Sequence, residues 1–496
     1  MPSCAEKLKE KLEILNHYNR VLTLLDWDMY TAAPKNGYQG MADSLSYFYQ
    51  KHFELSTSDE FYELLCEAKE PAVYDTLDEG MQYTVRTLHR DLTRERRVPK
   101  EFVARFIEAQ SRSRKAWEEA RTADDFSMYE PHLQAMIDLT QEKCGYTDPG
   151  ENVYDVLLDQ YEEGIHAGII DRVFGELKEG LKPLIETILE KEKDHPLSPI
   201  YSRTWPVHRQ KAVQDLLLEY IGYDFDSGTT GQSMHPFTLS FSRNDVRVTN
   251  RFHEDTPIPS MFTSIHEGGH AIFDQNVDPA LMGTEAASCK YMGVHESQSR
   301  FFENILGRRR SFWIPIYPKV QELLPGLKDI SLDEFVREIN HVYPSFIRTE
   351  ADEVTYCLHI ILRYEMEQEI FRKGTKAKDL PQIWNAKMQQ LLGITPEKDS
   401  DGILQDMHWS DGGFGYFPSY LLGSIYDGMY LDAITAELGD VDRILERGGI
   451  KEITHWLNEK IHRYGGLRLP AQVIENVCHR ELSAEPLLRY FRGKYE

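Results

Sequence analysis

The sequence predicts a mostly α-helical protein built as one large body, and three observations support this. Apolar residues recur at steps of three and four along the first 30 residues, which indicates one face of an amphipathic helix. Long charged segments of the same texture continue through the rest of the chain. No internal repeat or low-complexity linker separates two halves, although 496 residues would permit two or three domains.

The helices are predicted in order from their apolar spacing and from the prolines and glycines that flank them. The first places six residues on one face: Leu8, Leu12, Leu15, Tyr18, Leu22 and Leu25. Later helices are expected over residues 101–122, just after Pro99, and over residues 169–195, 348–372 and 441–464. Interruptions are expected at Asp148-Pro149-Gly150 and within residues 196–206 and 228–236.

One short segment departs from the helical pattern. Residues 237–241 alternate apolar and polar, residues 242–245 have turn chemistry, and residues 246–249 alternate again. This pattern predicts a small β-hairpin. The alternation places Arg247 and Thr249 on the face opposite Val246 and Val248.

The composition is that of a protein with a large core. Hydrophobic residues make up 41% of the chain, with 22 Phe, 27 Tyr and 7 Trp, which argues against intrinsic disorder. There is no run of 18 or more apolar residues, so no transmembrane helix is expected. The residues after Met1 become charged at once without an apolar stretch, so no signal peptide is visible.

Charge and cysteine usage predict a cytoplasmic protein that binds neither nucleic acid nor membrane. Asp and Glu total 81 against 56 Lys and Arg, and the resulting net charge of −25 repels phosphate backbones and anionic lipids. The six cysteines are scattered without a Cys-x-x-Cys pair, which is typical of reduced thiols in the cytosol.

The clearest chemistry lies in residues 265–275. His266 and His270 are four residues apart, so on a helix they lie one turn apart on the same face. Two neutral imidazoles in this arrangement can both reach one Zn²⁺ at about 2.0–2.1 Å. Glu267, next to the first histidine, can hydrogen-bond a water on the metal without being a ligand. The His-Glu-x-x-His pattern therefore predicts a hydrolytic metal site.

Gly268 and Gly269 argue against an accidental match in an ordinary polar helix. The five-letter pattern alone arises by chance in a chain of this length on the order of a few per cent of the time. Two glycines inside a helix cost roughly 1 kcal/mol each relative to alanine, a penalty that a purely structural helix would avoid. Close approach of another backbone, or of an extended substrate, would explain both.

A catalytic zinc has three protein ligands, so a third must come from elsewhere in the chain. Glu296 would complete a set of two histidines and a carboxylate, and His295 beside it is the competing ligand. Spacing alone does not choose between them. A further charged segment, residues 347–353, places Arg348 among three acids and leads into an apolar run. Charges that precede a buried helix favour a functional role over a solvated face.

Together with these segments, several others resemble the carboxypeptidase Taq family, also called thermostable carboxypeptidase 1, a group of zinc-type metallocarboxypeptidases. Six blocks carry the resemblance in order: His235-Pro236-Phe237, Asp245-Val246-Arg247-Val248-Thr249, His266-Glu267-Gly268-Gly269-His270, His295-Glu296-Ser297-Gln298, Ile347-Arg348-Thr349-Glu350-Ala351-Asp352 and Gly402-Ile403-Leu404-Gln405-Asp406-Met407-His408-Trp409. Weaker similarity occurs at Trp27-Asp28, at residues 154–159 and at Leu488-Arg489-Tyr490-Phe491, so the resemblance spans essentially the whole chain.

The resemblance implies an almost entirely helical fold, related to the neurolysin-like oligopeptidases, with a deep substrate groove and a small sheet beside the metal-binding helix. We expect a single domain over residues 1–496, with the N-terminal helices, roughly residues 1–130, as a lid over the groove. By the resemblance, His266, His270 and Glu296 hold one metal ion per chain, Zn²⁺ with Co²⁺ or Mn²⁺ as alternatives. Members of this family release single residues from peptide C-termini with broad preference, in the cytosol and as homodimers.

The expected mechanism is hydrolysis by a metal-activated water. Glu267 takes a proton from this water as general base and passes it to the leaving amine. The tetrahedral oxyanion needs a donor besides the metal, and we expect Tyr420, with Tyr416 as the alternative, from the aromatic segment 412–420. Core packing of these tyrosines is an equally good interpretation.

A carboxypeptidase also needs a group that captures the free carboxylate of its substrate. Arginine suits this task because its planar fork makes two charge-assisted bonds to a carboxylate. Arg348 and Arg247 are the candidates, with Arg348 favoured. The alternative for each is an internal ion pair, of Arg348 with Asp352 or of Arg247 with Asp245.

Four further residues are candidates for supporting roles. His235 and His408 are expected to line the substrate site, although a buried histidine bonded to a neighbour is an equally good interpretation. Asp352 or Glu353 is expected to orient a ligand histidine through a hydrogen bond.

Three other functions compete with this interpretation. The nearest is an endo-acting oligopeptidase with the same metal centre, because fold and ligands do not determine where a peptide is cut. An aminopeptidase would need an acidic group placed for the substrate amine, and no motif stands out for this. A non-enzymatic helical scaffold would bind no stoichiometric metal.

Overall fold

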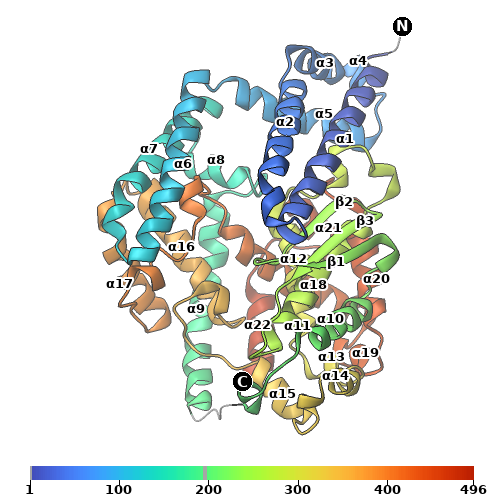
Figure 1. Ribbon diagram of the computed structural model, residues 1–496, viewed down its shortest axis with the longest axis vertical. Coiled ribbons are helices and arrows are strands. Elements are labelled where there is room, and N and C mark those ends of the chain that lie inside the picture. Colours follow the sequence, from blue (N-terminus) through green and yellow to red (C-terminus); the bar gives the residue numbers. More distant parts are fainter. Residues whose placement is uncertain (1–2, 194–197) are drawn as a thin grey trace.

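A computed structural model describes residues 3–193 and 198–496 and confirms the predicted fold class. Most of these residues are helical, and one small sheet lies among them (Figure 1). The N-terminal helices gather at the end of the molecule where the chain begins (Figure 1). They are α1 (Cys4–Thr31), α2 (Tyr38–Ser56), α3 (Asp59–Lys69), α4 (Pro71–Tyr74) and α5 (Glu79–Arg96).

The N-terminal helices have an apolar core of their own. Leu8, Leu12 and Leu15 of the predicted α1 face are buried there against α3 and α5. Further along the same face, Leu22 is buried, whereas Tyr18 and Leu25 are partly exposed. This cluster is separate from the main core, so α1, α3 and α5 form a packing unit distinct from the body that carries the site.

The main body consists of helices packed around one large core. Helices α12 and α18 make the most extensive contact between any two elements of the described chain. Helix α18 is apolar on nearly every side, which explains its burial. The helices are α6 (Lys100–Ala123), α7 (Glu130–Thr147), α8 (Val153–Asp159), α9 (Ala167–Glu192), α10 (Val207–Ile221), α11 (Ile258–Gln275), α12 (Met292–Arg300), α13 (Arg310–Trp313), α14 (Tyr317–Leu323), α15 (Leu332–Ile339), α16 (Thr355–Phe371), α17 (Leu380–Leu392), α18 (Pro418–Leu438), α19 (Val441–Glu446), α20 (Ile450–Lys460), α21 (Pro470–Cys478) and α22 (Glu485–Tyr495).

The small sheet lies beside α11 and contains the predicted hairpin. Strands β2 (Thr238–Ser242) and β3 (Asp245–Asn250) pair antiparallel, and β1 (Gly228–Gln232) adds to β3 in parallel, giving the order β1-β3-β2. Val246 and Val248 are fully buried. Strand β1 was not predicted, because its sequence Gly-Thr-Thr-Gly-Gln has no apolar alternation and has the composition of a turn.

Three predicted helices have different boundaries in the structure. The predicted helix 348–372 begins only at Thr355, because Asp352 accepts bonds from the backbone N–H groups of Val354 and Thr355 and so caps a later start. The predicted helix 441–464 is divided into α19, α20 and a short turn, with Gly448 at φ +77° between the two helices. The predicted helix 169–195 corresponds to α9, and its residues 194–195 lie outside the described residues.

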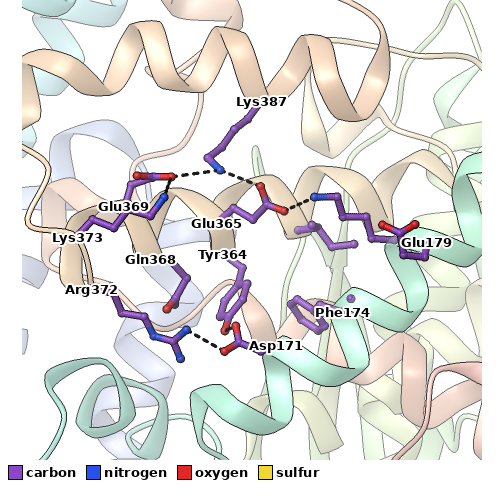
Figure 2. A pocket seen from close by; sticks show the side chains of 13 residues that line it. Asp171, Phe174, Glu179, Tyr364, Glu365, Gln368, Glu369, Arg372, Lys373 and Lys387 are labelled. Atoms are coloured by element: carbon purple, nitrogen blue, oxygen red, sulfur yellow. Dashed lines mark hydrogen bonds and ion pairs between the residues drawn. The ribbon is translucent and has the colours of Figure 1, made fainter.

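A hollow of about 450 Å³ lies between α9, α16 and α17, and it contains none of the predicted site residues (Figure 2). Charged side chains cross it as ion pairs, with Lys387 bonded to both Glu365 and Glu369 (Figure 2). Arg372 and Tyr364 both bind Asp171 on α9. Because most of its charges are paired with one another, we assign this hollow a structural role.

The sequence also predicted the absence of membrane-spanning helices and the presence of reduced cysteines. Within residues 3–193 and 198–496, no helix is long and apolar enough to cross a membrane. All six cysteines are free, and four of them are buried, which agrees with the predicted reduced thiols.

Candidate metal centre

His266 and His270 project from one face of α11 toward Glu296 of α12. The Nε2 atoms of His266 and His270 lie 3.9 and 3.6 Å from Glu296 Oε2. Two ligand atoms bound tetrahedrally to one ion at about 2.1 Å are separated by roughly 3.4 Å, so the three side chains fit a zinc-like ion with small adjustments. Within the described part of the chain, this is the only group of three or more potential ligands with all its ligand atoms within 4.8 Å of one another.

The two glycines of the motif explain why the helices come so close. A Cβ atom on Gly269 would lie 2.6 Å from the backbone oxygen of Gln298 on α12, and one on Gly268 would lie 2.6 Å from Ile221 of α10. The chain therefore uses glycine for the close approach of another backbone and of neighbouring side chains. This approach brings Glu296 to the two histidines.

His295 turns away from this cluster and lies behind His270. Its Nδ1 is 2.7 Å from Nδ1 of His270, and its Nε2 is 3.2 Å from a carboxylate oxygen of Asp274. On the other side, His266 Nδ1 is 2.8 Å from Glu303, which lies in the π-helical turn Phe301–Leu306. His266 and His270 are thus each held through Nδ1, which leaves their Nε2 atoms for an ion.

The residues expected to orient the ligand histidines have other partners. Asp352 accepts bonds from its own helix start and from the Thr355 hydroxyl. Glu353 is buried among side chains of α22, where it accepts bonds from Tyr490 and Tyr495. The predicted role therefore passes to Glu303 and to the His295–Asp274 pair. These contacts depend on how α11 and α12 pack, which spacing along the chain does not reveal.

Glu267 is 8% exposed and faces the sheet. The Thr238 hydroxyl on β2 lies 2.7 Å from Glu267 Oε2 and 3.0 Å from its backbone oxygen. Burial raises the pKa of the Glu267 carboxyl, and His266 and the Thr238 hydrogen bond oppose that rise. A buried carboxylate held by one oxygen keeps its other oxygen for proton transfer.

Arg247 lies on the opposite face of the sheet from Glu267. Thr238 pairs in register with Val248, so Thr238 and Val248 share the face toward α11, and Arg247 points the other way. Its guanidinium bonds Asp245 through Nε and Nη2, both at 2.8 Å, and lies over the ring of Phe241. The predicted alternative for Arg247, an ion pair with Asp245, is therefore observed.

Arg348 lies in a buried polar cluster and is 7% exposed. Its Nε and Nη2 donate to Asp406 Oδ1 at 3.1 and 2.9 Å, and its Nη1 donates to the Tyr356 hydroxyl at 3.1 Å. The predicted alternative partner, Asp352, is wrong, because that side chain caps α16. The observed partner, Asp406, lies two residues before His408 in the sequence. No spacing rule predicts its contact with Arg348.

Arg300 connects this cluster to the metal ligands, and sequence reasoning missed it. Its Nη1 lies 3.5 Å from Glu296 Oε1, and its guanidinium lies 4.1 Å from the centre of the Tyr356 ring. Contacts therefore run from Glu296 through Arg300 and Tyr356 to Arg348. The spacing of four residues between Glu296 and Arg300 on one helix could have indicated this pair.

Tyr420, Tyr416 and His408 form one aromatic group beside Arg348. The Arg348 guanidinium lies 5.1 Å from the Tyr420 ring, the Tyr416 and Tyr420 ring centres are 5.2 Å apart, and His408 stacks on Tyr416 at 5.3 Å. Burial raises the pKa of Tyr420 well above its usual value, so its hydroxyl remains a donor. Burial lowers the pKa of His408 to about 4. His235 is exposed in the turn before β2, outside this group.

Glu162, which sequence reasoning also missed, caps the helix that carries Glu296. Its Oε1 accepts a bond from the backbone N–H of Gly293 in the first turn of α12, and it is fully buried. Burial raises the pKa of this carboxyl from 4.5 to about 7. An unfolded chain would release this proton near pH 4.5, so the stability of the fold decreases as pH rises from about 4.5 to about 7.

We therefore expect Glu162→Gln to raise the free energy of unfolding at pH 8, by up to about 3 kcal/mol, with no gain near pH 4. The amide keeps an oxygen for Gly293 N–H, and the Ser419 hydroxyl lies beside the other position. Denaturant unfolding at both pH values measures this. The matched control is Glu163→Gln, which removes an ion pair with Arg90 and should not stabilise the protein. A loss of stability at pH 8 for Glu162→Gln would contradict the prediction.

Comparisons with known proteins agree with this geometry. A family described as "Carboxypeptidase Taq (M32) metallopeptidase" matches residues 7–495. The chain is 40% identical over 485 residues to "Carboxypeptidase 1" of Bacillus subtilis (strain 168), covering 98% of this chain and 96% of that protein. It is 37% identical over 502 residues to "Thermostable carboxypeptidase 1" of Pyrococcus furiosus, covering 97% and 98%. The crystal structure of an M32 carboxypeptidase from Deinococcus radiodurans R1 superposes with a TM-score of 0.94 at 32% identity, covering 100% of this chain and 99% of that one.

Proposed function

Because the chain belongs to the carboxypeptidase Taq (M32) family of metallopeptidases, we propose that it releases single amino acids from the C-termini of peptides, with broad preference. Its substrates in this proposal are peptides with a free C-terminal carboxylate. We place the enzyme in the cytoplasm as a homodimer, with the N-terminal helices as a lid. The separate apolar core of α1, α3 and α5 supports the lid, and the contact of Trp27 on α1 with Phe237 places that unit next to Thr238.

His266, His270 and Glu296 would hold one metal ion per chain in this proposal, with Zn²⁺ favoured and Co²⁺ or Mn²⁺ as alternatives. The separation of their ligand atoms and the two-histidine, one-carboxylate chemistry support this set. When bound, the ion supplies a Lewis acid that polarises the scissile carbonyl and makes water acidic. Glu303 and His295 hold the far side of each histidine, which keeps Nε2 directed at the site.

Glu267 performs the proton transfers in the proposed mechanism. The Thr238 hydroxyl holds Oε2, so Oε1 is available to take a proton from the attacking water and to pass it to the leaving amine. Burial raises the pKa of Glu267, which makes it a stronger base than an exposed carboxylate. The Tyr420 hydroxyl, with Tyr416 as the alternative, donates to the oxyanion of the tetrahedral intermediate.

The single observation that carries the exopeptidase assignment is the charge around Arg348. Arg348 and Arg363 share one carboxylate, that of Asp406, whose pKa the two guanidinium groups hold far below its usual range. Burial lowers the pKa values of His359 to about 3 and of His408 to about 4, so neither histidine is charged at pH 7. One positive charge is left over, and a substrate carboxylate can neutralise it. Arg247, by contrast, is paired with Asp245.

Mass spectrometry of an N-acylated peptide during incubation with Zn²⁺- or Co²⁺-loaded protein tests this proposal. We expect the peptide to lose one residue at a time from its C-terminal end, and we expect a metal chelator to stop the reaction. Fragments from an internal cut would instead support an endo-acting oligopeptidase with the same metal centre. An unchanged peptide would contradict both functions.

A further inference from the structure

Helix α16 presents a row of polar side chains to the segment 402–415. Tyr356, His359, Arg363 and Glu367 are three or four residues apart and so lie along one face of the helix. Glu367 accepts bonds from Trp409 Nε1 and from Gly415 N–H, which fixes the segment against α16. Within this contact, one residue is charged, fully buried and bonded to the same carboxylate as Arg348. That residue is Arg363.

Arg363 and Arg348 share two acceptor residues, Asp406 and Gln405. Asp406 receives Arg348 through Oδ1 and Arg363 Nε through Oδ2 at 2.7 Å. Gln405 Oε1 receives the backbone N–H of Arg348 at 3.0 Å and Arg363 Nη2 at 2.7 Å. Arg363 Nη1 donates to the backbone oxygen of His359 at 2.8 Å, so all three of its nitrogens are engaged. Its exposed fraction is 0%, which keeps it away from any substrate.

Arg348 keeps two donors unused in this arrangement. A guanidinium has five N–H groups, and three of those of Arg348 go to Asp406 and Tyr356. One N–H remains on each terminal nitrogen, so both nitrogens can still donate to an arriving carboxylate. The hydrogen bonds to Asp406 and Tyr356 fix the plane of the group, so little side-chain freedom is lost when a carboxylate binds.

We propose that Arg363 is a positioning residue that sets the affinity for the substrate carboxylate by sharing Asp406 with Arg348. Without Arg363, Asp406 and Arg348 would form a neutral pair, and an arriving carboxylate would meet the full charge of Asp406. With Arg363 present, the cluster keeps one net positive charge although Arg348 is held by a carboxylate. This inference rests on the proposed exopeptidase function and explains how Arg348 can be both anchored and receptive.

The test is the substitution Arg363→Met, which removes the charge and keeps most of the volume. It leaves Asp406 paired with Arg348, so no buried charge loses its only partner. We expect KM for an N-acylated free-acid peptide to rise about tenfold or more. The value of kcat should stay within about twofold, because Arg363 does not touch the metal ligands or Glu267 in the structure. The inhibition constant of the amidated peptide, measured as a competitor of the free acid, should not change.

Two further variants separate this role from a structural one. Arg363→Lys keeps the charge and should restore most of the affinity. Arg363→Met combined with Asp406→Asn should also restore most of the affinity, because the carboxylate that Arg363 neutralises is then gone. If Arg363→Met does not fold, Arg363→Gln, which is also neutral, carries the same expectation for KM.

The outcomes distinguish this inference from the proposed function. If the wild-type enzyme does not discriminate between free-acid and amidated peptides, both are overturned. If the wild type prefers the free acid and Arg363→Met leaves that preference unchanged, only the role of Arg363 is overturned. Equal increases in KM for the free acid and in the inhibition constant of the amide would also overturn it, because they would show a general distortion of the site.

Discussion

Glu267→Gln is expected to lower kcat by about a thousandfold or more while the protein still binds one metal ion per chain. The amide has nearly the same shape as the carboxylate and can accept the Thr238 hydrogen bond, so the site should keep its geometry. It cannot take a proton from water at any working pH, and the general-base step is lost. Steady-state kinetics on an N-acylated free-acid peptide, with metal content measured by emission spectrometry on the same sample, give the result.

Thr238→Val is the matched control for this substitution, because it changes the environment of Glu267 and leaves the carboxylate in place. The Thr238 hydrogen bond lowers the pKa of Glu267, so its removal raises that pKa further. A base is inactive once protonated, and the acidic limb of the activity profile should therefore move to higher pH. A profile that does not move, or a Glu267→Gln enzyme with nearly full activity, would contradict the assignment of Glu267.

Arg348→Ala is expected to lower kcat/KM for a free-acid peptide by about a hundredfold or more, mainly through KM. Removing a buried charged partner of a carboxylate typically costs about 2–5 kcal/mol, which corresponds to this range. The same variant should treat an amidated peptide as the wild type does. Asp406 remains paired with Arg363 in this variant, so the fold should tolerate the substitution.

Arg247→Ala is the matched control for Arg348→Ala. Arg247 is the other arginine that the sequence offered for binding the substrate carboxylate. In the structure it points to the opposite face of the sheet and is neutralised by Asp245. We expect Arg247→Ala to change the kinetics of the free-acid peptide little and to leave the amidated peptide spared. A large loss for Arg247→Ala with little change for Arg348→Ala would contradict the assignment. Binding of the substrate carboxylate would then have to be assigned to Arg247 on the sheet.

The sequence predicted the parts of the site that depend on local spacing. His266 and His270 share a face of α11 because they are one helical turn apart. The cost of Gly268 and Gly269 in a helix indicated a close approach, and Gly269 does meet the backbone of α12. The hairpin 237–249 followed from period-two alternation and its turn.

Features that depend on how helices rotate against each other could not be predicted. His295 and Glu296 are adjacent on α12 and point about 100° apart, so the rotation of α12 against α11 decides which one faces the histidines. The partners Glu303, Asp406 and Arg363 come from other elements or distant segments. The late start of α16 depends on the cap made by Asp352, and this cap separates Arg348 from the helix on which it was predicted.

The most direct test is mass spectrometry of two peptides, an N-acylated free acid and its C-terminal amide, each incubated with the metal-loaded wild-type protein. If the surplus charge around Arg348 selects a free carboxylate, the acid will be trimmed residue by residue and the amide will be spared. Equal cleavage of both peptides, at the terminus or internally, would contradict carboxylate recognition as the basis of this enzyme's function.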